Sequence, residues 1–349
     1  MGDESVTGER LDPARSLRAA FDRIGLGLTW IVLLGVLGVS VAAWWVGVEP
    51  GPAIRYGPLL LSLVLFGLPH GAVDHLVPAR LGGLSLTRSL SVVGLGYAVL
   101  GGLYLGLWLV APRYAAASFI AVTWFHWGQG DVHALLAFVE SPHLDSRARR
   151  VGTLVVRGGL PMLVPLIGFP GRYQAVLGEW LALFFGDVDL AWAQVPAVRL
   201  LLGSGFLAVT VAVLASGYRS TGPTRGWRID AGETVLLWTF FLVVPPLVAI
   251  GVYFTIWHSL RHVFRLVGFG SDGLSVRAQF GRFARDAAPL TGLAIVLLVG
   301  FWVVVPASPT AVPGLVALYL VFIAVLTVPH VVVVSWMDRQ EGVWQSPVG

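Results

Sequence analysis

The stretch GLGLTWIVLLGVLGVSVAAWWVGV, residues 25–48, carries no charged side chain over a length that crosses a bilayer. A hydrocarbon core of about 30 Å needs roughly 20 apolar residues in a helix. Comparable runs recur along the chain at Gly57–Pro78, Ser89–Ala111, Tyr114–Val139, Val151–Phe169, Pro196–Ser216, Ala231–Leu266, Ala288–Ala307 and Pro313–Trp336. The sequence therefore predicts an all-α, polytopic transmembrane helical bundle.

Two segments depart from this simple pattern. As one helix, Ala231–Leu266 would run about 54 Å, which is longer than a bilayer is thick. Pro245 and Pro246 lie near its middle and predict a break there, because proline interrupts the helical hydrogen bonds. Gly171–Gly186 mixes Glu179 with aromatic residues and is typical of an interfacial helix. We expect ten spans, within a range of eight to ten.

The distribution of arginines predicts how the helices are oriented across the membrane. Arginines gather in alternate connections, at Arg80 and Arg88, at Arg147, Arg149 and Arg150, at Arg219, Arg225 and Arg228, and at Arg277, Arg282 and Arg285. Basic loops stay on the cytoplasmic side of a membrane. We therefore expect a cytoplasmic N-terminal segment at 1–24, a single transmembrane domain at 25–337 and a cytoplasmic C-terminal tail at 338–349, in a multi-pass protein of the plasma membrane.

The composition excludes several kinds of chemistry. Only 12% of the residues are charged and 56% are hydrophobic, so a soluble domain is not expected. There is no cysteine, which rules out disulfides, thiolate metal sites and cysteine nucleophiles. The net charge of +4 comes from loop arginines, and we interpret it as a topology signal, with no nucleic acid among the partners.

Histidines provide the main functional signal. Seven of the eight lie in apolar segments, namely His70, His75, His126, His133, His258, His262 and His330. Ionisable groups within a membrane are costly and usually functional. A single buried histidine is more often a hydrogen-bonded packing residue, but the whole set favours a metal site.

The spacing of these histidines suggests how they meet. Under the ten-span topology, His70, His126 and His258 share one level near the bilayer midplane, and His262 and His330 lie about a turn deeper toward the cytoplasm. His258 and His262 are four residues apart, so both project from one helix face and can bind one ion. With His70 and His126 they would form a four-histidine site. Neutral nitrogen ligands suit iron, copper, nickel or zinc.

Two acidic residues accompany the histidines. Asp74 lies one helical turn from His70 on the same face, and Asp131 follows His126 by five residues. A buried carboxylate needs a partner, and an imidazole N–H that it accepts fixes the tautomer that faces a metal. We expect both acids to support the ligands in this way. An interhelical hydrogen bond without a role in metal binding is the alternative.

Three motifs together resemble a known family. They are HGAVDH at 70–75, HWGQGD at 126–131 and WHSLRH at 257–262. In order and spacing they are similar to those of the Brp/Blh family, which are bacterial and archaeal β-carotene dioxygenases associated with rhodopsins. The resemblance covers most of the chain.

The resemblance implies a non-haem Fe(II) enzyme that uses O₂ to cleave the central double bond of β-carotene into two molecules of all-trans-retinal. It makes 25–337 a dioxygenase domain and implies a functional link to a retinal-binding rhodopsin. It implies the metal ligands His70, His126, His258 and His262. His330 is expected to support the ligands or to replace one. His75 and His133 are expected to be structural.

Aromatic residues crowd the motifs and are expected to line a tunnel for the polyene. They are Trp124, Phe125, Trp127, Tyr253, Phe254 and Trp257. Packing between helices is the alternative role for these side chains.

Two other functions compete. A lipid desaturase or hydroxylase also uses histidine clusters, but it needs more histidine boxes than the single HxxxH present here. A transporter of metal ions or protons would spread polar residues through the full depth of the membrane. We expect Glu233, Arg157 and Arg199 to lie near span ends, which leaves the polar residues clustered and favours the dioxygenase.

Overall fold

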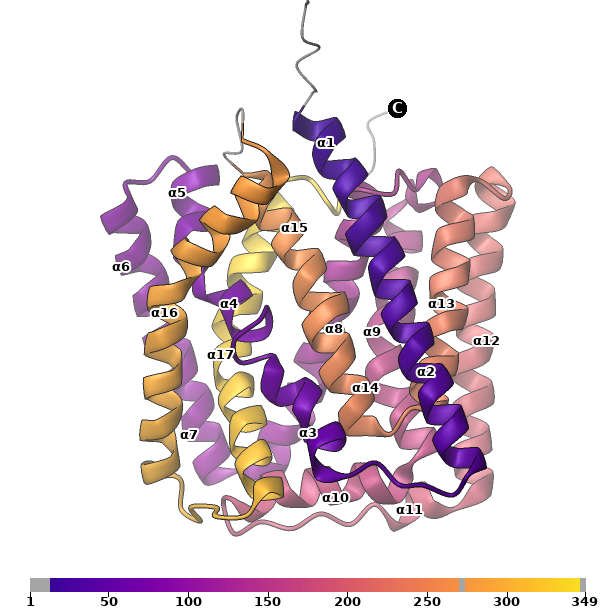
Figure 1. The fold of residues 1–349 in the computed structure, drawn as a ribbon, viewed down its shortest axis with the longest axis vertical. Coiled ribbons are helices and arrows are strands. Elements are labelled where there is room, and N and C mark those ends of the chain that lie inside the picture. The colour runs from indigo at the N-terminus through magenta and orange to yellow at the C-terminus, as the bar shows by residue number, and fades with distance from the viewer. Residues whose placement is uncertain (1–12, 270–273, 346–349) are drawn as a thin grey trace, which may run out of the picture.

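In the computed structural model, residues 13–269 and 274–345 are described, and all regular structure within them is helical. Residues 1–12 and 346–349, which belong to the predicted terminal segments, lie outside the described residues. Long helices run side by side in Figure 1 and surround a small central group of short ones. The all-α prediction is confirmed.

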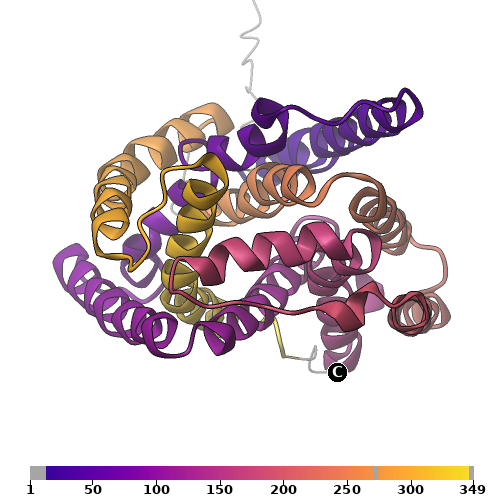
Figure 2. The ribbon, with the colours of Figure 1, turned by 90° about the horizontal axis from the view of Figure 1, so that it is seen from below.

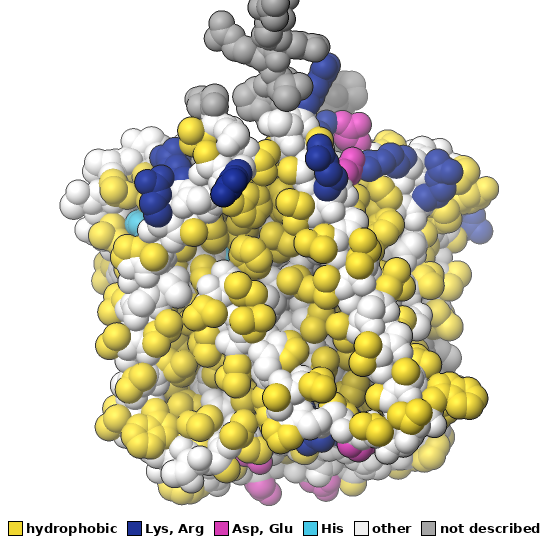
Figure 3. Space-filling model, viewed as in Figure 1, with side chains coloured by type: hydrophobic (Ala, Val, Ile, Leu, Met, Phe, Trp, Pro, Cys, Tyr) yellow, Lys and Arg dark blue, Asp and Glu magenta, His cyan; other side chains and the backbone are white. Residues whose placement is uncertain are grey.

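Seven helical stretches within the described ranges are long and apolar enough to cross a membrane. They are Arg15–Trp45, Leu86–Val110, Arg147–Gly168, Pro196–Thr221, Pro246–Gly268, Val276–Val304 and Val312–Gln340. The chain is thus a multi-pass membrane protein. Figure 3 agrees with this reading, since apolar side chains cover most of the flank and arginines concentrate at the end where α1 begins.

Several of these stretches are composite. The first joins α1 (Pro13–Ala20), the π-helical η1 (Phe21–Leu28) and α2 (Thr29–Trp45). The second joins α6 (Leu86–Gly96), η3 (Tyr97–Gly101) and α7 (Gly102–Val110). The fifth joins α14 (Pro246–Val252), η5 (Tyr253–Ser259) and α15 (Leu260–Gly268). The others are α9 (Arg147–Gly168), α12 (Pro196–Thr221), α16 (Val276–Val304) and α17 (Val312–Gln340).

Two further long helices, α8 (Pro112–Ala137) and α13 (Arg225–Val243), run alongside the seven in Figure 1. Both carry buried polar side chains, which lower their hydropathy. The seven stretches therefore leave out α8 and α13, although the sequence pattern predicts a span at each of these two helices.

The predicted break at Pro245 and Pro246 is confirmed, because α13 ends at Val243 and α14 begins at Pro246. The predicted interfacial helix corresponds to α10 (Pro170–Ala182). It is followed by α11 (Ala191–Gln194) and lies across one end of the bundle in Figures 1 and 2.

The prediction of one continuous helix over Gly57–Pro78 is wrong. The segment folds as α3 (Pro52–Leu61), α4 (Gly67–Ala72), the 3-10 turn η2 (Asp74–Leu76) and α5 (Val77–Leu81). The break after Leu61 depends on a close approach at Gly67, where an added Cβ would lie 2.6 Å from Ser62 O and 2.8 Å from the Phe254 ring. Only glycine fits at this position, and the break places the short α4 inside the bundle.

Candidate metal centre

Five histidines from five separate helical elements meet inside the bundle. They are His70 on α4, His126 on α8, His258 on η5, His262 on α15 and His330 on α17. All five are buried. The meeting point is near mid-height, because His258 lies halfway along the 23-residue stretch from Pro246 to Gly268. The predicted common level is therefore confirmed.

His70, His126 and His258 form the tightest group. One ring nitrogen of each lies within 4.8 Å of the others, which is a spacing that one metal ion can bridge. The Nε2 atoms of His126 and His258 are 3.1 Å apart. Two nitrogens bound at right angles to one ion, each at about 2.1 Å, would be about 3 Å apart. The observed distance fits shared coordination.

His262 and His330 pack against this group. The His330 ring centroid lies 4.9 Å from that of His70, 4.8 Å from that of His126 and 5.3 Å from that of His262. The Nε2 atoms of both His262 and His330 are buried and have no hydrogen-bond partner among the residues that the structure describes. Buried polar atoms are rarely left unpaired in native structures, so two such nitrogens beside three convergent imidazoles indicate a binding site for a cation.

The opposite nitrogens of three rings are held by acceptors. His70 Nδ1 is 2.9 Å from Phe66 O, and His330 Nδ1 is 2.8 Å from Asp74 Oδ2. His126 Nδ1 is 3.4 Å from Gln129 Oε1. Such contacts fix the tautomer in which Nε2 is free to bind a metal.

Asp74 has a different partner from the one expected. We expected its carboxylate to support His70, which lies one turn away in a regular helix. Instead Asp74 Oδ2 contacts His330 Nδ1 and accepts a 2.6 Å hydrogen bond from Tyr97 OH. The helix ends at Ala72 and turns through η2, and this rotates Asp74 toward α17.

Asp131 was also expected to support a histidine, and it does not. Its carboxylate accepts a hydrogen bond from Trp257 Nε1 at 3.0 Å and pairs with Arg157 and Arg261. Asp131 lies five residues after His126, so its side chain projects from a different side of α8, away from His126. Its role is to join helices behind the histidines.

Asp131 belongs to a buried group that we call the ion cluster, made up of Asp131, Arg157, Asp230, Glu233 and Arg261. Arg157 donates to Asp230 Oδ1 at 2.8 Å and to Glu233 Oε2 at 3.0 Å. Arg261 pairs with Glu233 and Asp131. The cluster connects α8, α9, α13 and α15. The prediction that Arg157 and Glu233 lie near span ends is wrong, because both are fully enclosed between these helices.

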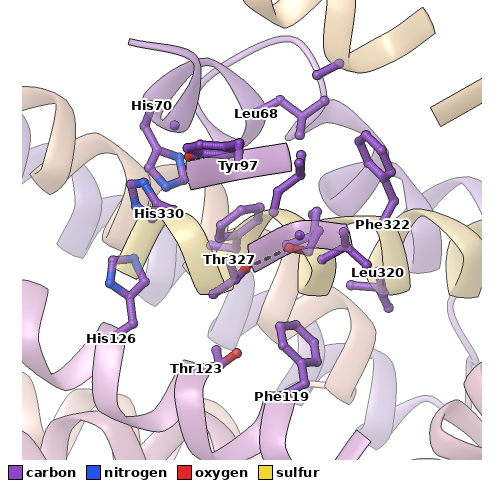
Figure 4. A pocket seen from close by; sticks show the side chains of 18 of the residues that line it. Leu68, His70, Tyr97, Phe119, Thr123, His126, Leu320, Phe322, Thr327 and His330 are labelled. Carbon is purple, nitrogen blue, oxygen red and sulfur yellow. Dashed lines mark hydrogen bonds between the residues drawn. The ribbon is translucent and has the colours of Figure 1, made fainter. Parts of the chain in front are cut away.

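A cavity of about 930 Å³ opens beside the histidines. His70, His126, His258 and His330 form part of its wall, and most of the remaining wall is apolar. Figure 4 shows His70, His126 and His330 close together on one side of this space, with Phe119, Leu320 and Phe322 away from them. Its volume is at the upper end of the range of about 300–1,000 Å³ that is usual for ligand pockets.

Two of the six aromatic residues expected to line a tunnel for the polyene contribute to this wall. Trp127 and Phe254 line the cavity. The other four predicted residues do not contribute to its wall, namely Trp124, Phe125, Tyr253 and Trp257.

These four side chains have other surroundings. Trp124 donates to Val155 O on α9 at 2.9 Å, and Phe125 is 39% exposed. Tyr253 and Trp257 are fully buried, and the Arg261 guanidinium lies 3.7 Å from the centre of the Trp257 ring. Packing and support of the ion cluster account for these positions.

The two histidines expected to be structural lie outside the centre. His75 Nδ1 is 3.1 Å from Ala72 O, and His133 Nε2 is 3.5 Å from Glu341 Oε2. Sequence reasoning missed Tyr97 and Gln129, which contact Asp74 and His126. Gln129 carried a signal, since it lies three residues after His126 on the same helix face. Nothing local to Tyr97 relates it to Asp74.

Five imidazoles converge in a membrane-embedded helical bundle next to a large apolar cavity, and three of them could hold a metal ion, which is the arrangement of a histidine-lined site in a membrane protein. The sequence model of the family described as Beta-carotene 15,15'-dioxygenase matches residues 61–338. The chain belongs to this family.

Individual relatives agree with this assignment. The chain is 52% identical over 320 residues to a probable beta-carotene 15,15'-dioxygenase, Blh, of Halobacterium salinarum, covering 89% of this chain and 92% of the relative. It is 32% identical over 343 residues to the probable beta-carotene 15,15'-dioxygenase Brp of the same species, covering 92% of this chain and 94% of the relative. No solved structure matches the chain significantly.

Proposed function

We propose that this protein is a β-carotene 15,15'-dioxygenase whose histidine cluster binds one Fe(II). The proposed ligands are His70, His126, His258 and His262. The enzyme cleaves the central double bond of β-carotene with O₂ to give two molecules of all-trans-retinal. Each carbon of the broken bond receives one oxygen atom, so the reaction needs no external reductant.

The observation that carries this proposal is the junction between the histidine cluster and the apolar cavity. His70, His126 and His258 line the cavity and also form the group able to hold an ion. A ligand in the cavity therefore lies against the metal position. Imidazoles alone do not select iron over zinc or copper, and membership of a dioxygenase family favours a metal that activates O₂.

The protein contributes binding, orientation and a dry environment. Bound Fe(II) supplies activation of O₂. Trp127 and Phe254 flank the histidines and present flat apolar surfaces to a polyene. Tyr97 OH faces the same cavity but is engaged with Asp74. The largely apolar wall of the cavity suits a cleavage that requires no proton transfer from the protein.

The surroundings of the site fit a substrate that dissolves in lipid. β-Carotene is wholly apolar, and O₂ also partitions into hydrocarbon. We place the arginine-rich end on the cytoplasmic side of a plasma membrane, because basic residues are retained there. The product retinal is then released into the bilayer, where a retinal-binding rhodopsin is the natural acceptor.

The test uses purified protein in detergent, reconstituted anaerobically with Fe(II) and then given β-carotene and air. We expect retinal as the sole product by chromatography, and its loss after chelation. Longer apocarotenals would contradict the central position of the cut. Bound iron without cleavage of any carotenoid would favour a lipid desaturase or hydroxylase, and absence of bound metal would favour a transporter.

A further inference from the structure

The cavity extends to the flank of the molecule between two peripheral helices. On α16 its wall includes Leu290, Leu293, Leu297, Gly300 and Val304. These residues recur every three or four positions, so one face of α16 lines the cavity from Leu290 to the end of the helix.

The opposite wall is the composite helix α6–η3–α7. Here Leu90, Gly94, Tyr97, Gly101 and Leu105 line the cavity, again at intervals of three or four residues. Two of these are glycine, which keeps this wall thin. Two parallel helix faces of similar length therefore border one elongated space.

Some of these wall residues are also on the molecular surface. Leu293 is 49% exposed, Leu297 is 51% exposed and Leu90 is 45% exposed. The cavity is not enclosed, so side chains that line it can also reach the molecular surface. The cavity therefore reaches the flank along the border between α6 and α16.

Different neighbours hold the two helices. α16 packs against α4, α15 and α17, whereas α6–η3–α7 packs against η2, α8 and α17. At the arginine-rich end, Arg80 on α5 donates to Asp286 on α16 at 2.7 Å and closes the border there. Both helices belong to candidate membrane spans, so the open part of the border faces hydrocarbon.

We propose that β-carotene enters sideways from the bilayer through this slit between α6–η3–α7 and α16, lengthwise and roughly parallel to the two helices. The inference rests on the proposed function for the identity of the substrate. The lining of α16 from Leu290 to Val304 rises about 21 Å, which suits an extended polyene. Lateral entry also spares an apolar substrate any passage through water.

The absence of cysteine allows a reversible test, because any introduced cysteine is the sole thiol in the chain. Leu293→Cys places a thiol in the slit. Val296→Cys is the matched control, since Val296 lies on the same helix and is 66% exposed but does not line the cavity. Each variant, loaded with Fe(II) in liposomes that contain β-carotene, is treated with a bulky methanethiosulfonate reagent.

We expect modified Leu293→Cys to lose most of its retinal production and to regain it when a reductant removes the label, with bound iron unchanged throughout. Modified Val296→Cys should keep its activity. Equal activity of labelled and unlabelled Leu293→Cys would contradict the proposal that β-carotene enters through this slit. If unlabelled protein with bound iron makes no retinal at all, the proposed function fails instead.

A second pair of variants covers the opposite wall. Gly94 lines the cavity and Gly96 does not, and an added Cβ at either position has no atom within 4 Å. We expect Gly94→Phe to raise KM for membrane-dissolved β-carotene, and Gly96→Phe to leave it unchanged. Identical KM values in the two variants would contradict the slit even if Leu293→Cys fails to fold.

Discussion

The histidine cluster and the ion cluster share two helical stretches, α8 and η5–α15, yet the polar groups of the two clusters are satisfied in opposite ways. On α8, His126 belongs to the first and Asp131 to the second. On η5–α15, Arg261 lies between His258 and His262 in sequence but points to the ion cluster. In the ion cluster, each charged side chain has a partner of opposite charge.

The histidine cluster is incomplete without a ligand. Its members are imidazoles packed against one another, and the Nε2 atoms of His262 and His330 have no partner. Uncompensated polar atoms at this depth are costly, so the fold must be maintained by something else. The comparison suggests a division of labour in which the ion cluster holds the helices in place and the histidines remain open for a metal.

The strongest test of this division removes a ligand. We expect His258→Ala to abolish bound iron and retinal formation while leaving a folded protein in detergent. The loss should exceed the roughly 10–100-fold effect that follows removal of a residue supporting a ligand. Iron content after anaerobic reconstitution measures it. His133→Ala is the control, because the His133 ring is not among the residues that line the cavity and its Nε2 lies 3.5 Å from Glu341 Oε2. Wild-type iron in His258→Ala would exclude His258 as a ligand.

Removal of a charge from the ion cluster should lower the stability of the protein and leave iron binding intact. Arg157→Met would leave Asp230 and Glu233 buried with reduced compensation, and breaking a buried ion pair in this way costs about 3–5 kcal/mol. We expect a lower thermal unfolding temperature, with near-normal iron per folded molecule.

Arg113→Met is the matched control for Arg157→Met. It disrupts an exposed pair with Asp187 and should change stability little. Unchanged unfolding of Arg157→Met would show that the ion cluster does not hold the bundle together.

Sequence patterns predicted the histidine cluster better than the ion cluster. Seven histidines in apolar runs are conspicuous, and the interval between His258 and His262 specifies a shared face. Arg157 and Glu233 are single charges in long helices, and hydropathy does not reveal whether such a residue faces lipid, water or another charge. Their pairing depends on how α9 and α13 pack, which is tertiary information.

The same reasoning explains why four of the six aromatic residues expected along the tunnel lie outside the cavity wall. Trp124 and Phe125 are consecutive in α8, so their side chains point about 100° apart and cannot both face one cavity. The break between Leu61 and Gly67 had a local signal in Gly67 and Pro69, because proline interrupts helical hydrogen bonds, but its geometry depends on the approach of Phe254 from a distant helix. Periodicity thus predicts which residues share a face, but the long-range packing decides what that face contacts.

A substitution of His330 tests whether this residue belongs to the metal centre. Its ring lies among His70, His126 and His262, and its Nε2 has no partner. We expect His330→Ala to weaken iron binding by about 10–100-fold, as for a residue that supports or supplements the ligands. Competition with a chelator of known affinity measures this.

Added imidazole should partly restore iron binding to His330→Ala, because it can occupy the space of the missing ring. A variant that has only lost packing would not respond to imidazole. Wild-type iron affinity in His330→Ala would place this residue outside the metal centre.

The smallest effect is expected at Asp74, which acts on the cluster only through His330. Both partners contact the same oxygen, Asp74 Oδ2, so the single amide oxygen of Asp74→Asn can still accept from Tyr97 OH and His330 Nδ1, but the charge that strengthens both contacts is lost. We expect retinal formation to fall by less than in His330→Ala, with iron still bound. Tyr97→Phe is the control, because it removes one hydrogen bond and leaves the carboxylate on His330. A fully active Asp74→Asn would make the Asp74–His330 contact a packing feature, and the histidine cluster would then owe its orientation to the remaining acceptors, Phe66 O and Gln129 Oε1.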